Sequence, residues 1–168
     1  MRKFLAFFFV IALNIGTIFA QKDAQTLPAI QLKDMSGKSK DMSEYSKSGK
    51  ITIISFWATW CSPCKKELNN IHDLYDDWKN KYDLVLVAVN TDNARNTQKV
   101  KPYVDGQGWE FEIMMDVNQD FQRALNIVQI PHTFLLDQNG QVVYQHSGYV
   151  EGDEIALEEK IKALMAKK

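Results

Sequence analysis

The chain of 168 residues is long enough to form one domain with a hydrophobic core of its own. Its formal net charge is only −1, and no long run of Lys and Arg offers a surface for nucleic acid, so we expect no nucleic-acid partner. The only two cysteines lie close together in the sequence, which excludes a scaffold held by several disulfides.

The start of the chain has the pattern of a secretory signal peptide. Arg2 and Lys3 give a positive start, an apolar run follows from Phe4, and the small residue Ala20 stands where cleavage is expected. Asn14 interrupts this run, whose length is at the lower limit for a membrane span, so an uncleaved membrane anchor is the alternative. The pattern predicts a periplasmic or otherwise extracytoplasmic protein.

We therefore expect three parts: a signal peptide at 1–20, a flexible polar leader at 21–26 and one domain over 27–168. The domain is expected to begin with a β-hairpin on its edge. Residues 29–38 have the pattern of a short strand and a turn, in which Gly37 takes the positive-φ position.

The two cysteines follow an apolar, β-branched run at 51–57, which predicts a buried strand. The helix predicted after them has an apolar face of Leu68, Ile71, Leu74 or Tyr75, and Trp78. Cys61 then lies at the first helical turn, where unpaired N–H groups and the helix dipole favour a thiolate. In dithiol–disulfide exchange, Cys61 attacks a substrate disulfide and Cys64 resolves the mixed disulfide.

Three other interpretations of the cysteine pair are weaker. A structural disulfide between Cys61 and Cys64 closes too short a loop to remove much entropy from the unfolded chain. A zinc site needs two further ligands, and His72, His132 and His146 are scattered along the chain. Buried, inert cysteines do not suit a helix start. We therefore predict redox chemistry without metal or organic cofactor, because the dithiol is itself the redox group.

A second unbroken apolar run at 84–89 predicts another buried strand. With a helix between the two runs, a right-handed βαβ unit of parallel strands is expected. A polar loop at 91–96 follows, and then a helix over about 97–105 that Gly106 and Gly108 end.

Three strands and two helices are predicted in the last part of the chain. A short strand is expected at 111–114 and a short helix at 119–126. Asn139-Gly140 is a strong hairpin signal between strands at 130–137 and 142–144. The chain ends in an amphipathic helix over 154–166, whose apolar face is formed by Ile155, Leu157 or Glu158, Ile161, Leu164 and Met165.

Two motifs in this order resemble the thioredoxin fold: Trp60-Cys61-Ser62-Pro63-Cys64 before a helix, and Ile130-Pro131 at the start of a hairpin strand. The resemblance implies an α/β protein with three layers, α/β/α. It also implies that Pro131 is cis and faces the dithiol, and that the backbone of Ile130 pairs with a bound substrate strand. A trans proline at the strand start is the alternative. Trp60 and Pro63 are expected to line the substrate groove.

The export signal, the N-terminal hairpin and the run Cys64-Lys65-Lys66-Glu67 narrow the resemblance to the extracytoplasmic TlpA/ResA group. The long segment before Pro131 fits a strand–helix insertion around 89–111. The resemblance implies a thiol–disulfide oxidoreductase that works as a reductase on cysteine-containing protein substrates, fed by a membrane electron donor. Cytochrome c maturation is one such pathway.

Two other functions remain open. A thiol peroxidase of the peroxiredoxin group carries its cysteine in a Pro-x-x-x-Thr-x-x-Cys setting, and this chain has Thr59-Trp60-Cys61 without a proline ahead of it. The second is a non-catalytic module that uses the fold to bind peptides. The intact cysteine pair argues against this function.

The sequence departs from the thioredoxin pattern at two positions. Ser55 stands six residues before Cys61, where cytoplasmic-type thioredoxins have a buried aspartate, and in the ResA-like pattern Glu67 serves a related role. A partly buried Glu67 would have a raised pKa and shuttle a proton. The alternative is a surface glutamate paired with Lys65 or Lys66.

His132 is the second departure, since threonine is common at this position in the family. Close to Cys61, its imidazolium would stabilise the thiolate and make the protein more oxidising. The alternative is a hydrogen-bonded, partly buried histidine without a catalytic role.

Overall fold

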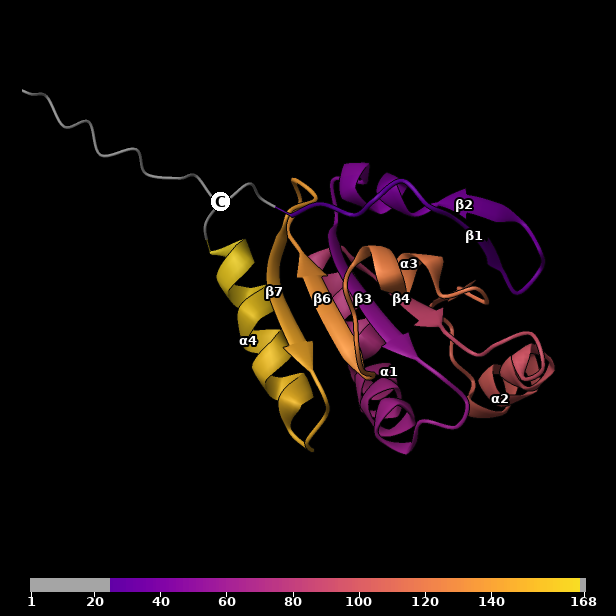
Figure 1. The fold of residues 1–168 in the computed structure, drawn as a ribbon. Coiled ribbons are helices and arrows are strands. Elements are labelled where there is room, and N and C mark those ends of the chain that lie inside the picture. Colours follow the sequence, from indigo (N-terminus) through magenta and orange to yellow (C-terminus); the bar gives the residue numbers. More distant parts are fainter. Residues whose placement is uncertain (1–24, 167–168) are drawn as a thin grey trace, which may run out of the picture.

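Strand β3 (Ile51–Trp57) forms the centre of the molecule (Figure 1). In the computed structural model, which describes residues 25–166, every residue of this strand is buried. It pairs in parallel with β4 (Leu84–Asn90) and antiparallel with β6 (His132–Leu136). A strand with neighbours on both edges and helices over both faces is predominantly apolar, and β3 matches the buried strand that the sequence predicted.

One sheet contains all the strands of the described residues, in the order β2-β1-β5-β4-β3-β6-β7. The remaining strands are β1 (Gln31–Asp34), β2 (Ser39–Asp41), β5 (Glu112–Met115) and β7 (Val142–Ser147). The hairpin of β1 and β2 lies at the sheet edge, and Gly37 in its turn has a φ of 88°. Both features confirm the prediction.

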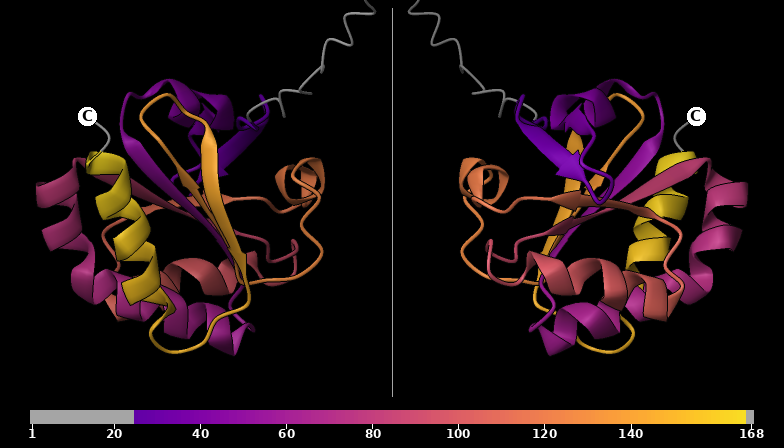
Figure 2. Two further views of the ribbon diagram at one scale, coloured as in Figure 1. Left: turned by 90° about the vertical axis from the view of Figure 1, so that its left-hand side faces the viewer. Right: turned by 90° about the vertical axis from the view of Figure 1, so that its right-hand side faces the viewer.

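Helices cover the two faces of the sheet in three layers, and the predicted α/β/α thioredoxin fold is therefore confirmed (Figure 2). One face carries α1 (Ser62–Tyr82), α2 (Val100–Gln107) and α4 (Asp153–Met165). The other carries α3 (Asp120–Ala124) and the 3-10 helix η1 (Met42–Lys47). A second 3-10 helix, η2 (Thr97–Lys99), leads into α2.

Alternation along β3 divides the core into two clusters. Ile53 and Trp57 point to the α1 side, where the buried cluster also contains both cysteines. Ile54 and Phe56 point to the opposite side and pack with the residues of α3 and η1. The reactive cysteine pair is therefore part of the larger core.

Three details differ from the sequence-based expectation. Gly106 lies inside α2, and the helix ends at Gly108, whose φ of 69° is left-handed. The ladder of β6 begins at His132, after Pro131, which has no N–H to donate. In α4, Ile155 is exposed, because Leu157 and Ile161 define the buried stripe and Ile155 lies on the other side of the helix.

The N-terminal region is described only from Gln25 onward. The carbonyl of Gln25 accepts a hydrogen bond from the N–H of Val142 at 2.8 Å, so part of the predicted leader is paired with β7. The predicted signal peptide at 1–20 lies outside the described residues. Among residues 25–166, no helix combines the length and apolar character needed to cross a membrane.

Candidate functional site

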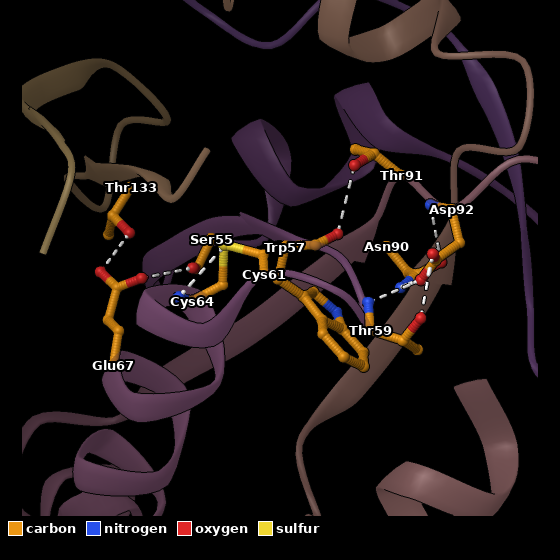
Figure 3. The surroundings of a disulfide bond; sticks show 10 residues. All are labelled: Ser55, Trp57, Thr59, Cys61, Cys64, Glu67, Asn90, Thr91, Asp92 and Thr133. Atoms are coloured by element: carbon orange, nitrogen blue, oxygen red, sulfur yellow. Dashed lines mark hydrogen bonds between the residues drawn. A yellow bond between two sulfur atoms is a disulfide. The ribbon is translucent and has the colours of Figure 1, made fainter. Parts of the chain in front are cut away.

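A disulfide joins Cys61 and Cys64 at the N-terminus of α1, as the motif predicted (Figure 3). Cys61 is the N-cap residue, and its sulfur accepts a hydrogen bond from the N–H of Cys64 at 3.3 Å. Pro63 lies within the first turn, where its missing N–H costs no helical hydrogen bond. The helix terminus thus places its unpaired N–H groups around the Cys61 sulfur and favours the thiolate.

The two sulfurs differ in their access to solvent. Cys61 is 4% exposed, whereas Cys64 is completely buried. Beside them, Trp60 is 66% exposed and Pro63 is exposed as well. An incoming thiol or disulfide therefore reaches Cys61 first and meets an apolar rim on the way.

The peptide bond between Ile130 and Pro131 is cis, which confirms the expectation drawn from the resemblance. Because His132 pairs with Phe56 near the end of β3, Pro131 lies at the same end of the sheet as the cysteines. Ile130 packs against the core cluster that contains both cysteines, and the carbonyl of Pro131 accepts a hydrogen bond from Gly148 at 2.9 Å.

Glu67 is a buried carboxylic acid one helical turn beyond Cys64. Its Oε1 accepts a hydrogen bond from Thr133 Oγ1 at 2.7 Å, and its Oε2 accepts one from Ser55 Oγ at 3.1 Å (Figure 3). Ser55 and Thr133 are paired in the β3–β6 ladder, so two neighbouring strands each supply one hydrogen-bond donor to the Glu67 carboxyl group. Ser55, in the place of the thioredoxin aspartate, therefore serves as a donor to this glutamate.

Burial raises the pKa of Glu67 to about 7, although the hydrogen bonds from Thr133 and Ser55 act in the opposite direction. Its carboxyl group thus takes up and releases a proton near neutral pH. The surface interpretation of Glu67 is wrong. Lys65 lies over the ring of Tyr103, and Lys66 pairs with Glu151 at 2.6 Å.

His132 does not support the imidazolium hypothesis. Its ring packs against Phe134 with centroids 4.7 Å apart, on the face of the sheet opposite to Glu67 and the cysteines. Burial lowers the pKa of His132, so the neutral imidazole is favoured. The alternative of a partly buried histidine fits this geometry better.

A second buried carboxylate supports the segment in front of Cys61. Asp92 is fully buried and accepts hydrogen bonds from the N–H of Thr59 at 2.7 Å and from its hydroxyl at 3.0 Å. Asn90 donates to the same carboxylate at 2.9 Å (Figure 3). The loop predicted as simply polar is therefore packed beneath the active-site segment, two residues from the reactive cysteine.

Residues 24–145 match the AhpC/TSA family. A relative from Geobacillus kaustophilus (strain HTA426), "Thiol-disulfide oxidoreductase ResA", is 31% identical over 82% of this chain and 78% of its own. "Sporulation thiol-disulfide oxidoreductase A" of Bacillus subtilis (strain 168) is 31% identical over 87% of both chains.

The chain belongs to the AhpC/TSA family, as a thiol–disulfide oxidoreductase of the TlpA/ResA type. A solved thioredoxin-like protein from Porphyromonas gingivalis has the same fold, with a TM-score of 0.73 and 46% identity over 82% of this chain and 90% of its own. An oxidoreductase of this type acts on cysteine-containing substrates through the cysteine pair.

Sequence reasoning missed several residues of the oxidoreductase site. Ser55 was noted only as a departure, although a hydroxyl inside a buried strand needs a polar partner. Thr133 was not singled out, because its contact with Glu67 depends on the register of β6. The signal for Asp92 was its position just after a buried strand, within the predicted polar loop at 91–96. Within residues 25–166, no group of three or more His, Cys, Asp or Glu is arranged to hold a metal.

Proposed function

We propose that this oxidoreductase works as a reductase of protein disulfides outside the cytoplasm. The observation that carries the exchange mechanism is the buried Glu67, which lies one helical turn from the buried sulfur of Cys64. The reducing direction follows the TlpA/ResA resemblance. A buried resolving thiol can attack only after it loses its proton, and Glu67 is the acceptor that α1 places next to it.

The proposed cycle uses the two sulfurs in fixed roles. In the reduced protein the Cys61 thiolate attacks a substrate disulfide, which forms a mixed disulfide and releases one substrate thiolate. Cys64 gives its proton to the Glu67 carboxylate and attacks the Cys61 sulfur. The second substrate thiolate leaves and takes a proton from solvent. The substrate gains two electrons, and the Cys61–Cys64 disulfide of this structure is the oxidised product.

The substrate-binding residues are proposed from their places around the disulfide. Trp60 and Pro63 form the exposed rim on one side, and cis-Pro131 directly precedes the first residue of β6 on the other. An extended substrate segment can pair with the backbone at Ile130 and bring its cysteine to Cys61. Recognition through backbone atoms tolerates many sequences, which suits a reductase with several protein substrates.

The cellular setting is also a proposal. A positive start followed by an apolar run supports export through a signal peptide at 1–20, with an N-terminal membrane anchor as the alternative. A reductase outside the cytoplasm has no local supply of reduced thioredoxin, so we propose a membrane electron donor as its partner. Cytochrome c maturation is the pathway that the TlpA/ResA resemblance favours.

The reduction potential of the Cys61–Cys64 couple tests the direction of the reaction. We expect about −270 mV or lower in dithiothreitol buffers, as for thioredoxin. A value near that of DsbA, about −120 mV, contradicts the reductase assignment and makes the protein a disulfide-forming enzyme.

A trapping experiment tests the roles of the two cysteines. The variant Cys64→Ser should accumulate a mixed disulfide with an oxidised peptide that carries Cys-x-x-Cys-His, the haem-attachment motif of c-type cytochromes. Cys61→Ser, the matched control, should capture none. Equal capture by both variants contradicts the assignment of the nucleophile, and rapid consumption of hydrogen peroxide by the wild type would favour a peroxidase instead.

A further inference from the structure

A small cavity lies on the solvent side of Glu67, between β7 and α4. The space open to the centre of a water molecule is about 10 Å³, and the polar lining is formed by Glu67, Thr133, Tyr144, His146, Asp153 and Glu154. Roughly this volume is enough for a single water, provided that two or more polar groups can bind it. The cavity therefore connects the buried carboxyl group to the side chains at the surface.

The strand register places a histidine at this cavity. His146 is paired with Thr133 in the β6–β7 ladder, so both side chains project from the same face of the sheet. Thr133 is the residue that donates a hydrogen bond to Glu67. The imidazole is thus a direct neighbour of the threonine that binds the buried carboxylate.

A carboxylate from α4 orients this histidine. Nε2 of His146 lies 3.1 Å from Oδ2 of Asp153, in close contact although without the alignment of a hydrogen bond. Both side chains are 32% exposed. Nε2 is buried while other parts of the side chain are exposed, so His146 both lines the cavity and is in contact with solvent.

We propose that His146, positioned by Asp153, carries protons between Glu67 and solvent during the catalytic cycle. The proposal rests on the proposed role of Glu67 as the proton acceptor of Cys64. It adds the exit for that proton, which a carboxyl group without access to water otherwise lacks.

The proton balance of this route is simple. After Cys64 has given its proton to Glu67, the neutral carboxylic acid passes it to neutral His146, directly or through one water in the cavity. Glu67 returns to the carboxylate form, and the imidazolium next to Asp153 releases the proton to solvent. No electrons move in these steps, because the electron pair travels only between the sulfur atoms. Imidazole suits this task because its charge changes between about pH 5 and 8.

Other charged and titratable groups face the same region. Tyr144 from β7 and Glu154 from α4 line the cavity, and Lys160 of α4 lies over the Tyr144 ring at 5.7 Å. Glu154 is already engaged as the acceptor for Tyr149 at 2.7 Å. Burial raises the pKa of Tyr144, which keeps the phenol neutral across the working range. Among these groups, His146 combines contact with the cavity and exposure to solvent with a ring that can both accept and donate a proton.

The test separates the attack of each cysteine. Reduced protein is mixed with dithionitrobenzoate, an aromatic disulfide whose two halves absorb visible light when released as thiolates. The first release reports the attack of Cys61, and the second reports the attack of Cys64 on the mixed disulfide. The reaction is run at low buffer concentration and at pH 6, where Glu67 starts protonated and must lose its own proton before it can accept that of Cys64. Under these conditions we expect His146→Gln to slow the second release about tenfold and to leave the first unchanged.

Further variants distinguish a proton relay from a structural role. A double variant that carries both Glu67→Gln and His146→Gln should release the second thiolate no more slowly than the single variant Glu67→Gln, since both residues serve one route. Added imidazole should restore the second release in His146→Ala. His72→Gln, on α1 beside Phe111, is the matched control and should behave as the wild type.

Each result has a defined meaning. If Glu67→Gln slows the second release and His146→Gln does not, the relay is overturned while the role of Glu67 stands. If Glu67→Gln has no effect, the proposed role of Glu67 fails, and the relay fails with it. If His146→Ala slows both releases equally and imidazole restores neither, the histidine acts on the structure and the proposal is wrong.

Discussion

At the scale of single residues, the site depends on where one carboxyl group is placed. Glu67 is buried with two hydroxyl donors and without a cation, since both neighbouring lysines interact elsewhere. Two neutral hydrogen bonds only partly offset the loss of hydration, and therefore the acid stays protonated to higher pH than usual. The same environment links the stability of the fold to pH.

The raised pKa predicts how stability changes with pH in the oxidised protein. In the unfolded chain the acid titrates near its ordinary value of 4.5, and in the folded protein near 7. Between these values the folded state binds more protons, so stability falls as the pH rises through this window. The loss should reach about 3 kcal/mol.

Denaturant unfolding at several pH values measures this effect. Glu67→Gln should remove most of the decrease, because an amide does not ionise. Glu110→Gln, at an exposed position, is the control and should retain the pH dependence of the wild type. If the free energy of unfolding changed with pH in parallel for the wild type and Glu67→Gln, the carboxyl group of Glu67 would not titrate in this window.

The residues of the site were predictable to different degrees. Cys61, Cys64 and Pro131 are contained in local motifs, which were sufficient to predict the paired cysteines and the cis peptide bond. Glu67 was found by its spacing from Cys64, but its burial depends on Thr133, which lies on a strand distant in sequence. Partnerships of that kind follow from strand register, which a single sequence does not specify.

At the scale of elements, the turn between β6 and β7 is fixed by contact with another element. Gly140 has a φ of 75°, and a Cβ atom there would lie 1.8 Å from the carbonyl oxygen of Ser46 in η1. The Asn139-Gly140 signal predicted the hairpin correctly. The second reason for glycine, the approach of η1, became visible only in the folded structure.

Replacement of this glycine should therefore cost more than turn strain alone. Gly140→Ala should destabilise the protein by about 3 kcal/mol, since both the left-handed conformation and the overlap with Ser46 act against it. Gly37→Ala is the matched control: its φ is 88°, but a Cβ there meets nothing within 4 Å, so about 1 kcal/mol is expected. Unfolding in denaturant measures both, and equal losses would contradict the steric argument.

The boundaries of elements were harder to predict than their order. The strand and helix order followed from apolar runs and turn residues. Helix α2 runs past Gly106 because the positive φ that ends it occurs at Gly108. In α4, Ile155 fits a helical apolar pattern, yet the position of α4 against α1 buries the stripe of Leu157 and Ile161 instead.

At the scale of the whole molecule, a reductase should be more stable when oxidised. A low reduction potential means that the folded state favours the disulfide over the dithiol. Unfolding should then require more denaturant for the oxidised protein than for the reduced one. The free energies of unfolding should differ by about 1.4 kcal/mol for every 30 mV by which the potential of the folded protein lies below that of the unfolded chain. A more stable reduced form would instead indicate an oxidant of the DsbA kind.

Addition of dithiothreitol during unfolding measures the difference between the two forms. A variant with both Cys61→Ser and Cys64→Ser is the control, because its stability should not change with the reductant. A change of similar size in that variant would mean that the reductant acts on the fold by some route other than the disulfide.

The pairing of Gln25 with Val142 fixes the end of the sheet at which the described chain enters the domain. Val142 pairs with Leu136, at the end of β6 that is remote from Pro131. The described chain thus enters the domain at one end of the sheet, and the start of α1 lies at the other end (Figure 1). The disulfide is at that start of α1. With the proposed N-terminal membrane anchor, the sheet would lie between the lipid surface and the disulfide. Cys61 would then be on the side away from the membrane, where protein substrates can reach it.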